Sequence, residues 1–249
     1  MSEDNMDYRS RFYKSYVSTH FGHLRDFSPE ALERQRRTFR HYYGCLLPPD
    51  RDARILEIGC GYGAFLYYLR AEGYRNVEGV DISPEQVEAA RCLRIPNVAC
   101  ADAVEFLNSR PETYLCVVAI DFLEHFLKQE ILGLLDAVYK SLKPGGRFIL
   151  QSPNADGPFA GRLRYSDFTH EFALTGTGAR QILETAEFGE VHVFGTDPYA
   201  HNLPSLVRVL SWKVIKTLLW IYLVAETGTI RGHLLTQNLI ALAQKPKLA

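Results

Sequence analysis

Short apolar runs alternate with amphipathic stretches through the middle of the chain. Apolar runs that end at a glycine or a polar residue predict five strands, at 54–58, 76–81, 97–100, 115–120 and 147–151. Apolar residues at helical spacing between them predict helices at 64–71, from Ser83 and Pro84 onward, and at 129–142. This alternation predicts an open, mostly parallel sheet with helices on both faces.

The two ends of the chain add helices to this pattern. Pro29–Tyr43 predicts an amphipathic helix with Ser28 as its N-cap, and Pro48-Pro49 marks a linker. Near the C-terminus we expect a helix at 178–186, strands at 191–194 and 238–243, and a long amphipathic helix over 206–224 between those strands. We therefore divide the chain into a helical N-terminal cap, 1–50, and an α/β domain, 51–249. Within that domain, 156–185 forms a segment over the strand ends, and 203–226 is a helical insertion before the last strand.

Composition narrows the class of protein. The 249 residues are 47% hydrophobic and 23% charged, which excludes disordered and fibrous architectures. The net charge of −1 argues against a dedicated nucleic-acid binder. The five cysteines have no metal-ligand spacing, so we expect reduced thiols in a cytoplasmic protein and predict no metal site. The polar N-terminus lacks a signal-peptide core, and the most apolar stretch, Thr217–Ala225, is too short to span a bilayer.

The strongest local signal is the glycine-rich turn Gly59-Cys60-Gly61-Tyr62-Gly63, between a predicted strand and a predicted helix. Such a turn lets a ligand approach the backbone at the carboxyl end of a strand. The turn also satisfies a loose dinucleotide fingerprint, and Asp81, 22 residues after Gly59, suits the ribose hydroxyls of NAD or of S-adenosylmethionine (SAM). By itself, the turn leaves both cofactors open.

Two carboxylates favour SAM. Glu57 lies beside the glycines, where it would repel a pyrophosphate but attract a cationic amino or sulfonium group. Asp102 follows the third strand, where it can accept a hydrogen bond from the adenine amino group.

With these features, the chain resembles the class I SAM-dependent methyltransferases. The resemblance covers roughly residues 52–153, and its pieces follow the expected order: Leu56–Gly63, Val80–Ser83, Ala101–Ala103, Phe122–His125 and Leu142–Gly146. It implies a seven-stranded Rossmann-like sheet whose last strand is antiparallel. It also implies that Gly59, Gly61 and Gly63 pass under the methionine part of SAM, that Asp81 holds the ribose and that Asp102 reads the adenine. We expect Glu57, Cys60, Ile82, Ala103 and Asp121 to line the same site.

A hydroxyl acceptor needs a general base, and two histidine clusters qualify. His125 follows the fourth strand within Phe122–His125, where it is a candidate base or a pocket-wall residue. His170 lies three residues after Asp167, an arrangement that can orient an imidazole, or that can cap a following helix instead. The segment around His170 resembles methyltransferases associated with polysaccharide assembly. We take His170 with Asp167 as the leading catalytic pair and His125 as the second candidate.

Two further segments have open roles. The aromatic residues Tyr13, Tyr16, His20 and Phe21 form either a lid over the cofactor or one face of a packed helix. The 206–224 helix has an apolar face and a face with Arg208, Lys213, Lys216 and two tryptophans. It suits the inner face of a membrane or an anionic glycan-lipid surface, but packing in the core or in a homodimer is the favoured alternative.

The sequence predicts a SAM-dependent methyltransferase that O-methylates a hydroxyl of a sugar or glycan intermediate. The alternatives are methylation of another small metabolite on oxygen or nitrogen, an NAD-dependent oxidoreductase, which Glu57 and Asp102 disfavour, and a non-catalytic cofactor-binding protein.

Overall fold

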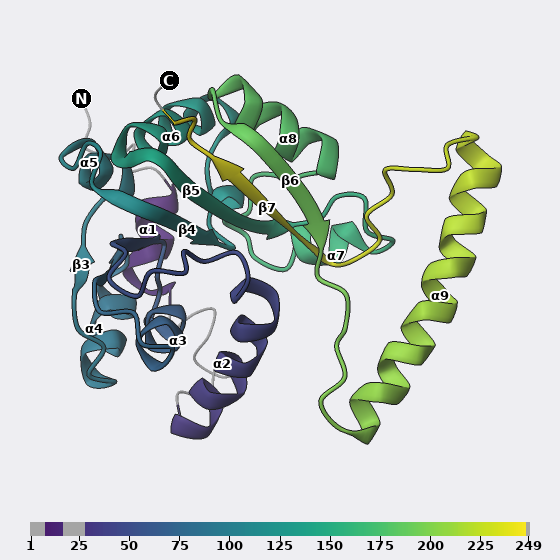
Figure 1. Ribbon diagram of the computed structural model, residues 1–249, viewed down its shortest axis with the longest axis horizontal. Helices are drawn as coiled ribbons and strands as arrows, with labels where there is room; N and C mark the ends of the chain where they lie inside the picture. Colours follow the sequence, from purple (N-terminus) through teal and green to yellow (C-terminus); the bar gives the residue numbers. More distant parts are fainter. Residues whose placement is uncertain (1–7, 17–27, 248–249) are drawn as a thin grey trace.

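The computed structural model describes residues 8–16 and 28–247, whose strands form one seven-stranded sheet (Figure 1). Its order is β3-β2-β1-β4-β5-β7-β6. The strands are β1 Ile55–Ile58, β2 Val77–Asp81, β3 Val98–Cys100, β4 Tyr114–Ile120, β5 Leu142–Pro153, β6 Gly189–Gly195 and β7 Asn238–Gln244. The last strand, β7, runs antiparallel to both of its neighbours, while the other pairs are parallel. The predicted Rossmann-like fold is confirmed.

Helices cover both faces of the sheet. One face carries α5 Ala103–Asn108, α6 Lys128–Ser141 and α8 Gly176–Thr185, and the other carries α2 Pro29–Tyr43, α3 Ala64–Ala71 and α4 Pro84–Cys92. The remaining helices are α1 Tyr8–Lys14, α7 Ala160–Arg164, α9 Leu203–Thr227 and the short 3₁₀ turn η2 Leu123–His125. Helix α2 begins as predicted, with the Ser28 side chain capping it, and packs on α3. The domain boundary at 50/51 remains a prediction.

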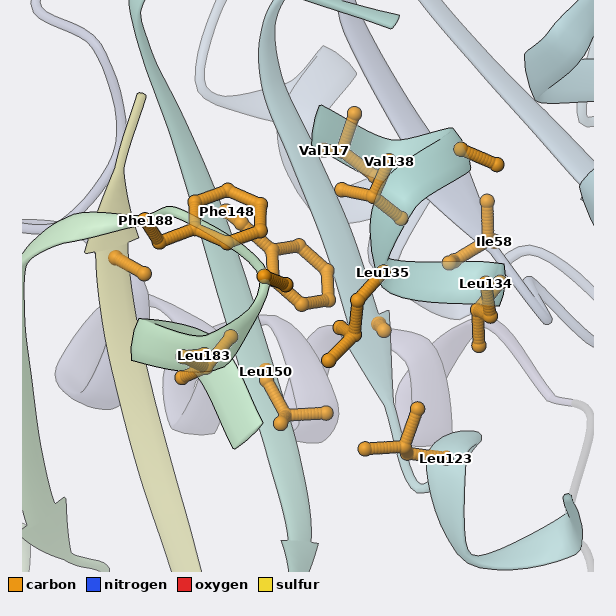
Figure 2. Close-up of a cluster of buried hydrophobic side chains, with 14 of the residues drawn as sticks. Ile58, Val117, Leu123, Leu134, Leu135, Val138, Phe148, Leu150, Leu183 and Phe188 are labelled. Atoms are coloured by element: carbon orange, nitrogen blue, oxygen red, sulfur yellow. The ribbon is translucent and has the colours of Figure 1, made fainter. Parts of the chain in front are cut away.

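Two buried clusters follow from the alternation of side chains along the central strands. Val117 and Phe148 point to one face, where Leu134, Leu135 and Val138 of α6 and Leu183 of α8 cover them (Figure 2). Cys116, Val118 and Ile149 point to the other face, among side chains of α3. Because both faces of these strands are buried, the sequences of the strands are continuous apolar runs.

The Pro144-Gly145-Gly146 turn lies inside β5, although the sequence placed it before that strand. Tyr114 of β4 faces Leu142, but the next paired residue, Cys116, faces Arg147, so the turn forms a bulge. The Gly145 N–H donates to the Lys245 carbonyl at 2.9 Å. The bulge is stabilised by residues after β7, which are remote in sequence.

Helix α9 lies between β6 and β7, as predicted, but it does not pack in the core. Figure 1 shows it standing apart from the sheet, and Ser205 is its one buried residue. Lys216 and Trp212 turn toward the domain and bind the Asp197 carboxylate, at 2.7 and 2.6 Å. The outer face carries a row of apolar side chains, each more than half exposed: Leu203, Val207, Leu210, Val214, Leu218 and Ile221. Among the described helices, none combines the length and the apolar character that crossing a membrane requires.

Candidate active site

The glycine turn after β1 is shaped by three glycines with positive φ: 67° at Gly59, 53° at Gly61 and 82° at Gly63. A Cβ at Gly59 would lie 2.2 Å from the Phe122 ring, and a Cβ at Gly63 would lie 2.8 Å from Ile95. At Gly61 the nearest atom would be 3.5 Å away, on Gln86. Gly59 and Gly63 are therefore required by packing, whereas a Cβ at Gly61 would make only an ordinary van der Waals contact with Gln86, which also lines the cavity.

Glu57, at the end of β1, is buried beside this turn. Among the described residues, its Oε2 atom has no hydrogen-bond partner. Burial, and then the charge of Asp81, raises the pKa of the Glu57 carboxyl. A buried carboxyl oxygen without a partner is costly, so this atom is placed to accept a hydrogen bond from a ligand. Binding of a cationic group of SAM by Glu57 remains a prediction.

Asp81 is held at the end of β2 by two backbone amides, those of Gly61 and Ser83, each 2.8 Å from one of its carboxylate oxygens. This contact joins the ends of β1 and β2 and fixes the carboxylate beside the cavity. The neighbouring Ile82 is half exposed, and Cys60 is buried in the turn.

Asp102 has a structural role that the sequence analysis missed. Its Oδ1 caps helix α5 by accepting from the amides of Val104 and Glu105, at 2.9 and 3.0 Å. Asp102 and Ala103 line a smaller cavity together with Phe122 and Phe126. Recognition of adenine by Asp102 remains a prediction and must involve the oxygen that does not cap the helix.

Asp121 connects the site to the N-terminal helices. Its side chain accepts from Gln151 at 3.0 Å, and Gln151 accepts from the buried Tyr43 hydroxyl of α2 at 2.6 Å. Gln151 and Tyr43 have no recognisable signal in the sequence, because their partners lie in distant segments.

Two adjoining cavities, of about 480 and 190 Å³, run along the carboxyl ends of β1 to β4. They share Tyr13, Gly59, Asp81, Ile82, Phe122 and His125. Within the described part of the chain, the lining of the larger cavity includes five carboxyl side chains and no Lys or Arg. Such a lining favours cationic and hydroxyl-bearing ligands and repels a pyrophosphate. The position is the usual ligand site of an open α/β sheet.

The acceptor side of the larger cavity is built around Asp167, which forms a turn with Thr169. Asp167 Oδ1 accepts from the Thr169 amide at 2.8 Å and from the Thr169 hydroxyl at 2.7 Å. The Tyr16 hydroxyl donates to Oδ2 at 2.5 Å. Burial, and then this hydrogen bond, raises the pKa of the Tyr16 phenol. The carboxylate is thus engaged by its own loop and by the N-terminal segment.

The predicted pairing of Asp167 with His170 is not formed. His170 Nδ1 donates to the Leu163 carbonyl at 3.0 Å. Asp167 instead reaches His125 through Thr169, whose Oγ1 lies 2.8 Å from His125 Nδ1. Because the Thr169 hydroxyl donates its proton to Asp167, it must accept the proton of His125 Nδ1. The alternative in which Asp167 or Thr169 caps a helix is also wrong, because α8 begins only at Gly176 and is capped by Thr175.

Both imidazoles therefore donate a hydrogen bond through Nδ1, and Nε2 is the ring nitrogen that remains for a ligand. The two rings meet edge-on in the cavity, with centroids 4.8 Å apart and an interplanar angle of 66°. Burial, and then repulsion from His170, lowers the pKa of His125 to about 4, so this ring is neutral at neutral pH. Next to them, Glu124 is fully buried, and burial raises the pKa of its carboxyl. In the sequence, Glu124 belongs to the Phe122–His125 motif, and no sequence signal predicts that its side chain lines the site.

The N-terminal aromatic cluster is partly described. Tyr13 and Tyr16 line the larger cavity, and each ring lies 6.4 Å from the His125 ring. His20 and Phe21 lie outside the described residues. A lid role for this segment remains a prediction.

Comparison with known proteins identifies a family. The family model for a methyltransferase domain matches residues 23–203. A Mycobacterium tuberculosis protein that bears a methyltransferase name is 49% identical over 51 residues, or 20% of this chain and 30% of that protein. The ubiquinone biosynthesis O-methyltransferase of Neisseria meningitidis is 25% identical over 107 residues, or 41% and 44% of the two chains. The matches thus span less than half the length of these curated relatives. Among solved structures, a SAM-dependent methyltransferase from Archaeoglobus fulgidus superposes with a TM-score of 0.63 at 24% identity, covering 86% of this chain and 94% of that one.

Proposed function

Because the chain belongs to the methyltransferase domain family, with SAM as its cofactor, we propose that it transfers the methyl group of SAM to a hydroxyl oxygen of a sugar or glycan intermediate. The family and the fold support the reaction class and the cofactor. The hydroxyl acceptor and its sugar character are our proposal, and they depend on the chemistry of the larger cavity.

The residues at the ends of β1 and β2 fit SAM. Gly61 lines the larger cavity without a side chain, so the methionine part can lie against its backbone, and the unpartnered Oε2 of Glu57 can accept from the amino group. The Asp81 carboxylate can also accept from ribose hydroxyls. SAM supplies an electrophilic methyl carbon on a sulfonium, and the acidic lining stabilises that positive charge.

The observation that carries the proposal is the pair of imidazoles whose Nδ1 atoms are engaged in hydrogen bonds, which leaves Nε2 of each ring for the acceptor. A neutral alcohol must lose its proton to become a nucleophile, whereas a free amine already has a lone pair. The two imidazoles therefore support an acceptor hydroxyl in front of His125 and His170, whether these nitrogens take its proton directly or act through a bound cation. His170 and His125 are the proposed acceptor-side residues, and Asp167 positions His125 through Thr169.

A polyhydroxylated acceptor matches the rest of the lining. Ser166 and Asn238 also line the larger cavity, and their side chains can form hydrogen bonds with hydroxyls of the acceptor. In the 156–185 segment, Phe159, Tyr165 and Phe168 are exposed close in sequence to the cavity residues Leu163, Ser166 and Asp167. Phe159 and Tyr165 therefore offer exposed rings to an acceptor, whereas Phe168 stacks on Phe12 of α1.

The test is methyl transfer from methyl-labelled SAM to nucleotide sugars, oligosaccharides, small phenols and amines, in parallel. We expect label on a sugar hydroxyl, and an Asp81→Ala variant should show much weaker binding of S-adenosylhomocysteine. Label found on amines alone would refute the hydroxyl acceptor, and preferential binding of NAD would refute the cofactor assignment.

We also propose that α9 places the protein on an anionic membrane surface, as a peripheral contact rather than as a span. Its apolar row is flanked by Arg208 and Lys213, and Glu226 near its end is the one acidic residue of the helix. An apolar face with basic flanks is typical of helices that lie at the lipid headgroups. Co-sedimentation with vesicles containing phosphatidylglycerol should retain the wild type and release a Leu210→Glu, Leu218→Glu variant. A concentration-dependent dimer that both substitutions abolish, without vesicle binding, would instead assign this face to a homodimer.

A further inference from the structure

We propose that Glu124, His125 and His170 bind a divalent cation at the acceptor side of the cavity. The inference rests on the proposed function and extends it, because the cation would bind the acceptor hydroxyl. One potential ligand atom from each residue lies within 4.8 Å of the others. Two nitrogen donors and a carboxylate suit a divalent ion that accepts both nitrogen and oxygen ligands, for which Mn²⁺ is a suitable probe.

The two imidazoles are oriented as metal ligands usually are. A ligating histidine commonly donates its other ring N–H to a carbonyl or to a group linked to a carboxylate, which fixes the tautomer. His170 donates to the Leu163 carbonyl, and His125 donates to Thr169, which in turn donates to Asp167. These hydrogen bonds engage Nδ1 of each ring, so Nε2 of each ring is the nitrogen left for coordination.

Glu124 is the independent observation that points to a ligand. Its side chain is 0% exposed, lines the cavity, and has no hydrogen-bond partner at either carboxyl oxygen among the described residues. Neutralising this carboxyl by protonation would still leave a buried donor and a buried acceptor unpaired. A cation satisfies both oxygens and favours the ionised form, so it removes a cost that the protein alone does not offset.

Cation binding requires the three side chains to move closer together. Two ligands about 2.0–2.3 Å from one ion are at most roughly 4.6 Å apart when they lie on opposite sides of it, and adjacent ligands are closer. The donors lie within 4.8 Å of one another, so side-chain rotation must bring them together. The sequence analysis predicted no metal because the ligands come from two segments, with His125 and His170 45 residues apart and without a metal-ligand motif.

The bound cation would activate the acceptor hydroxyl. Three protein ligands leave coordination positions open, and an oxygen on a divalent ion loses its proton at a lower pH. The O–H bond breaks and its proton leaves to water. The resulting alkoxide forms the new O–C bond while the C–S bond of SAM breaks, and that electron pair stays on sulfur. Atoms and charge balance without a further reactant.

Calorimetric titration of the chelator-treated, full-length protein with Mn²⁺ tests the site directly. We expect one Mn²⁺ per chain, and we expect Glu124→Gln and His170→Ala each to weaken binding at least tenfold. His233→Ala is the matched control, because His233 is a partly exposed histidine on a loop after α9, and it should bind Mn²⁺ like the wild type. Each variant must bind S-adenosylhomocysteine normally, which shows that it is folded.

A wild-type protein that fails to bind Mn²⁺, or a Glu124→Gln variant that binds it unchanged, would overturn the cation site. Full methyl transfer to a hydroxyl by the metal-free protein would also overturn it, and would leave the proposed function intact. Mn²⁺ binding through these residues, with label only on amines, would support the cation site and refute the proposed acceptor.

Discussion

Replacing Gly61 by alanine should separate the role of the glycine turn in folding from its role in binding. Gly61 has a φ of 53°, and a Cβ there would meet nothing closer than 3.5 Å within the protein. The variant should therefore fold. Its stability should fall by about 1–2 kcal/mol, the usual cost of a left-handed backbone for a residue with a Cβ.

Binding should suffer more than stability. The added methyl group would occupy the space that we assign to the methionine part of the cofactor. Overpacking of a tight contact costs about 1–3 kcal/mol, which corresponds to a roughly 5- to 150-fold weaker affinity for S-adenosylhomocysteine. Titration calorimetry measures this affinity, and urea unfolding followed by circular dichroism measures the stability.

Gly73→Ala is the matched control. Gly73 also has a positive φ, 92°, and a Cβ there would meet no atom within 4 Å, but Gly73 is not among the residues that line the cavities. This variant should lose stability to a similar extent and keep its cofactor affinity. The assignment of the turn is refuted if Gly61→Ala binds S-adenosylhomocysteine as tightly as the wild type, or if Gly73→Ala weakens binding equally.

Three further substitutions probe other parts of the structure. Thr169→Val removes the link from His125 to Asp167, so Mn²⁺ affinity in calorimetry should fall about 10- to 100-fold; unchanged affinity would argue against this link as ligand support. Leu135→Ala leaves a cavity in the fully buried core, so urea unfolding should show a loss of about 2–5 kcal/mol, and a loss below 1 kcal/mol would contradict the packing. The hydrogen bond from Arg9 lowers the pKa of the Glu130 carboxyl in the folded protein. The stabilisation from this bond should therefore be complete above the ordinary pKa of a glutamate, and it should be lost as the pH falls through the lowered pKa of Glu130. The urea midpoints of wild type and Glu130→Gln should accordingly differ at pH 7 and converge at pH 3; a constant difference would contradict this linkage.

The sequence by itself determined most of the strands and the glycine turn at which we expect the cofactor. Buried parallel strands are continuous apolar runs, so their positions along the chain can be read locally. Glu57, Gly59, Gly61 and Gly63 are consecutive or nearly so, and a strand followed by a turn has few possible geometries. The sequence also placed α9 correctly between the last two strands.

Only the tertiary structure decided the acceptor side. The spacing of Asp167 and His170 allowed a contact, but Asp167 bonds to Thr169 and Tyr16, and His170 bonds to the Leu163 carbonyl. The hydrogen-bond partners of Asp167 and His170 depend on which donors and acceptors other loops bring close to them. A local sequence pattern does not contain this information. Helical spacing likewise showed which residues of α9 share a face, but not that the apolar face points outward, because orientation depends on what the rest of the domain offers. Lys216 and Trp212 bind the Asp197 carboxylate, so their face of α9 is turned toward the domain. The apolar row on the opposite face therefore points away from the sheet.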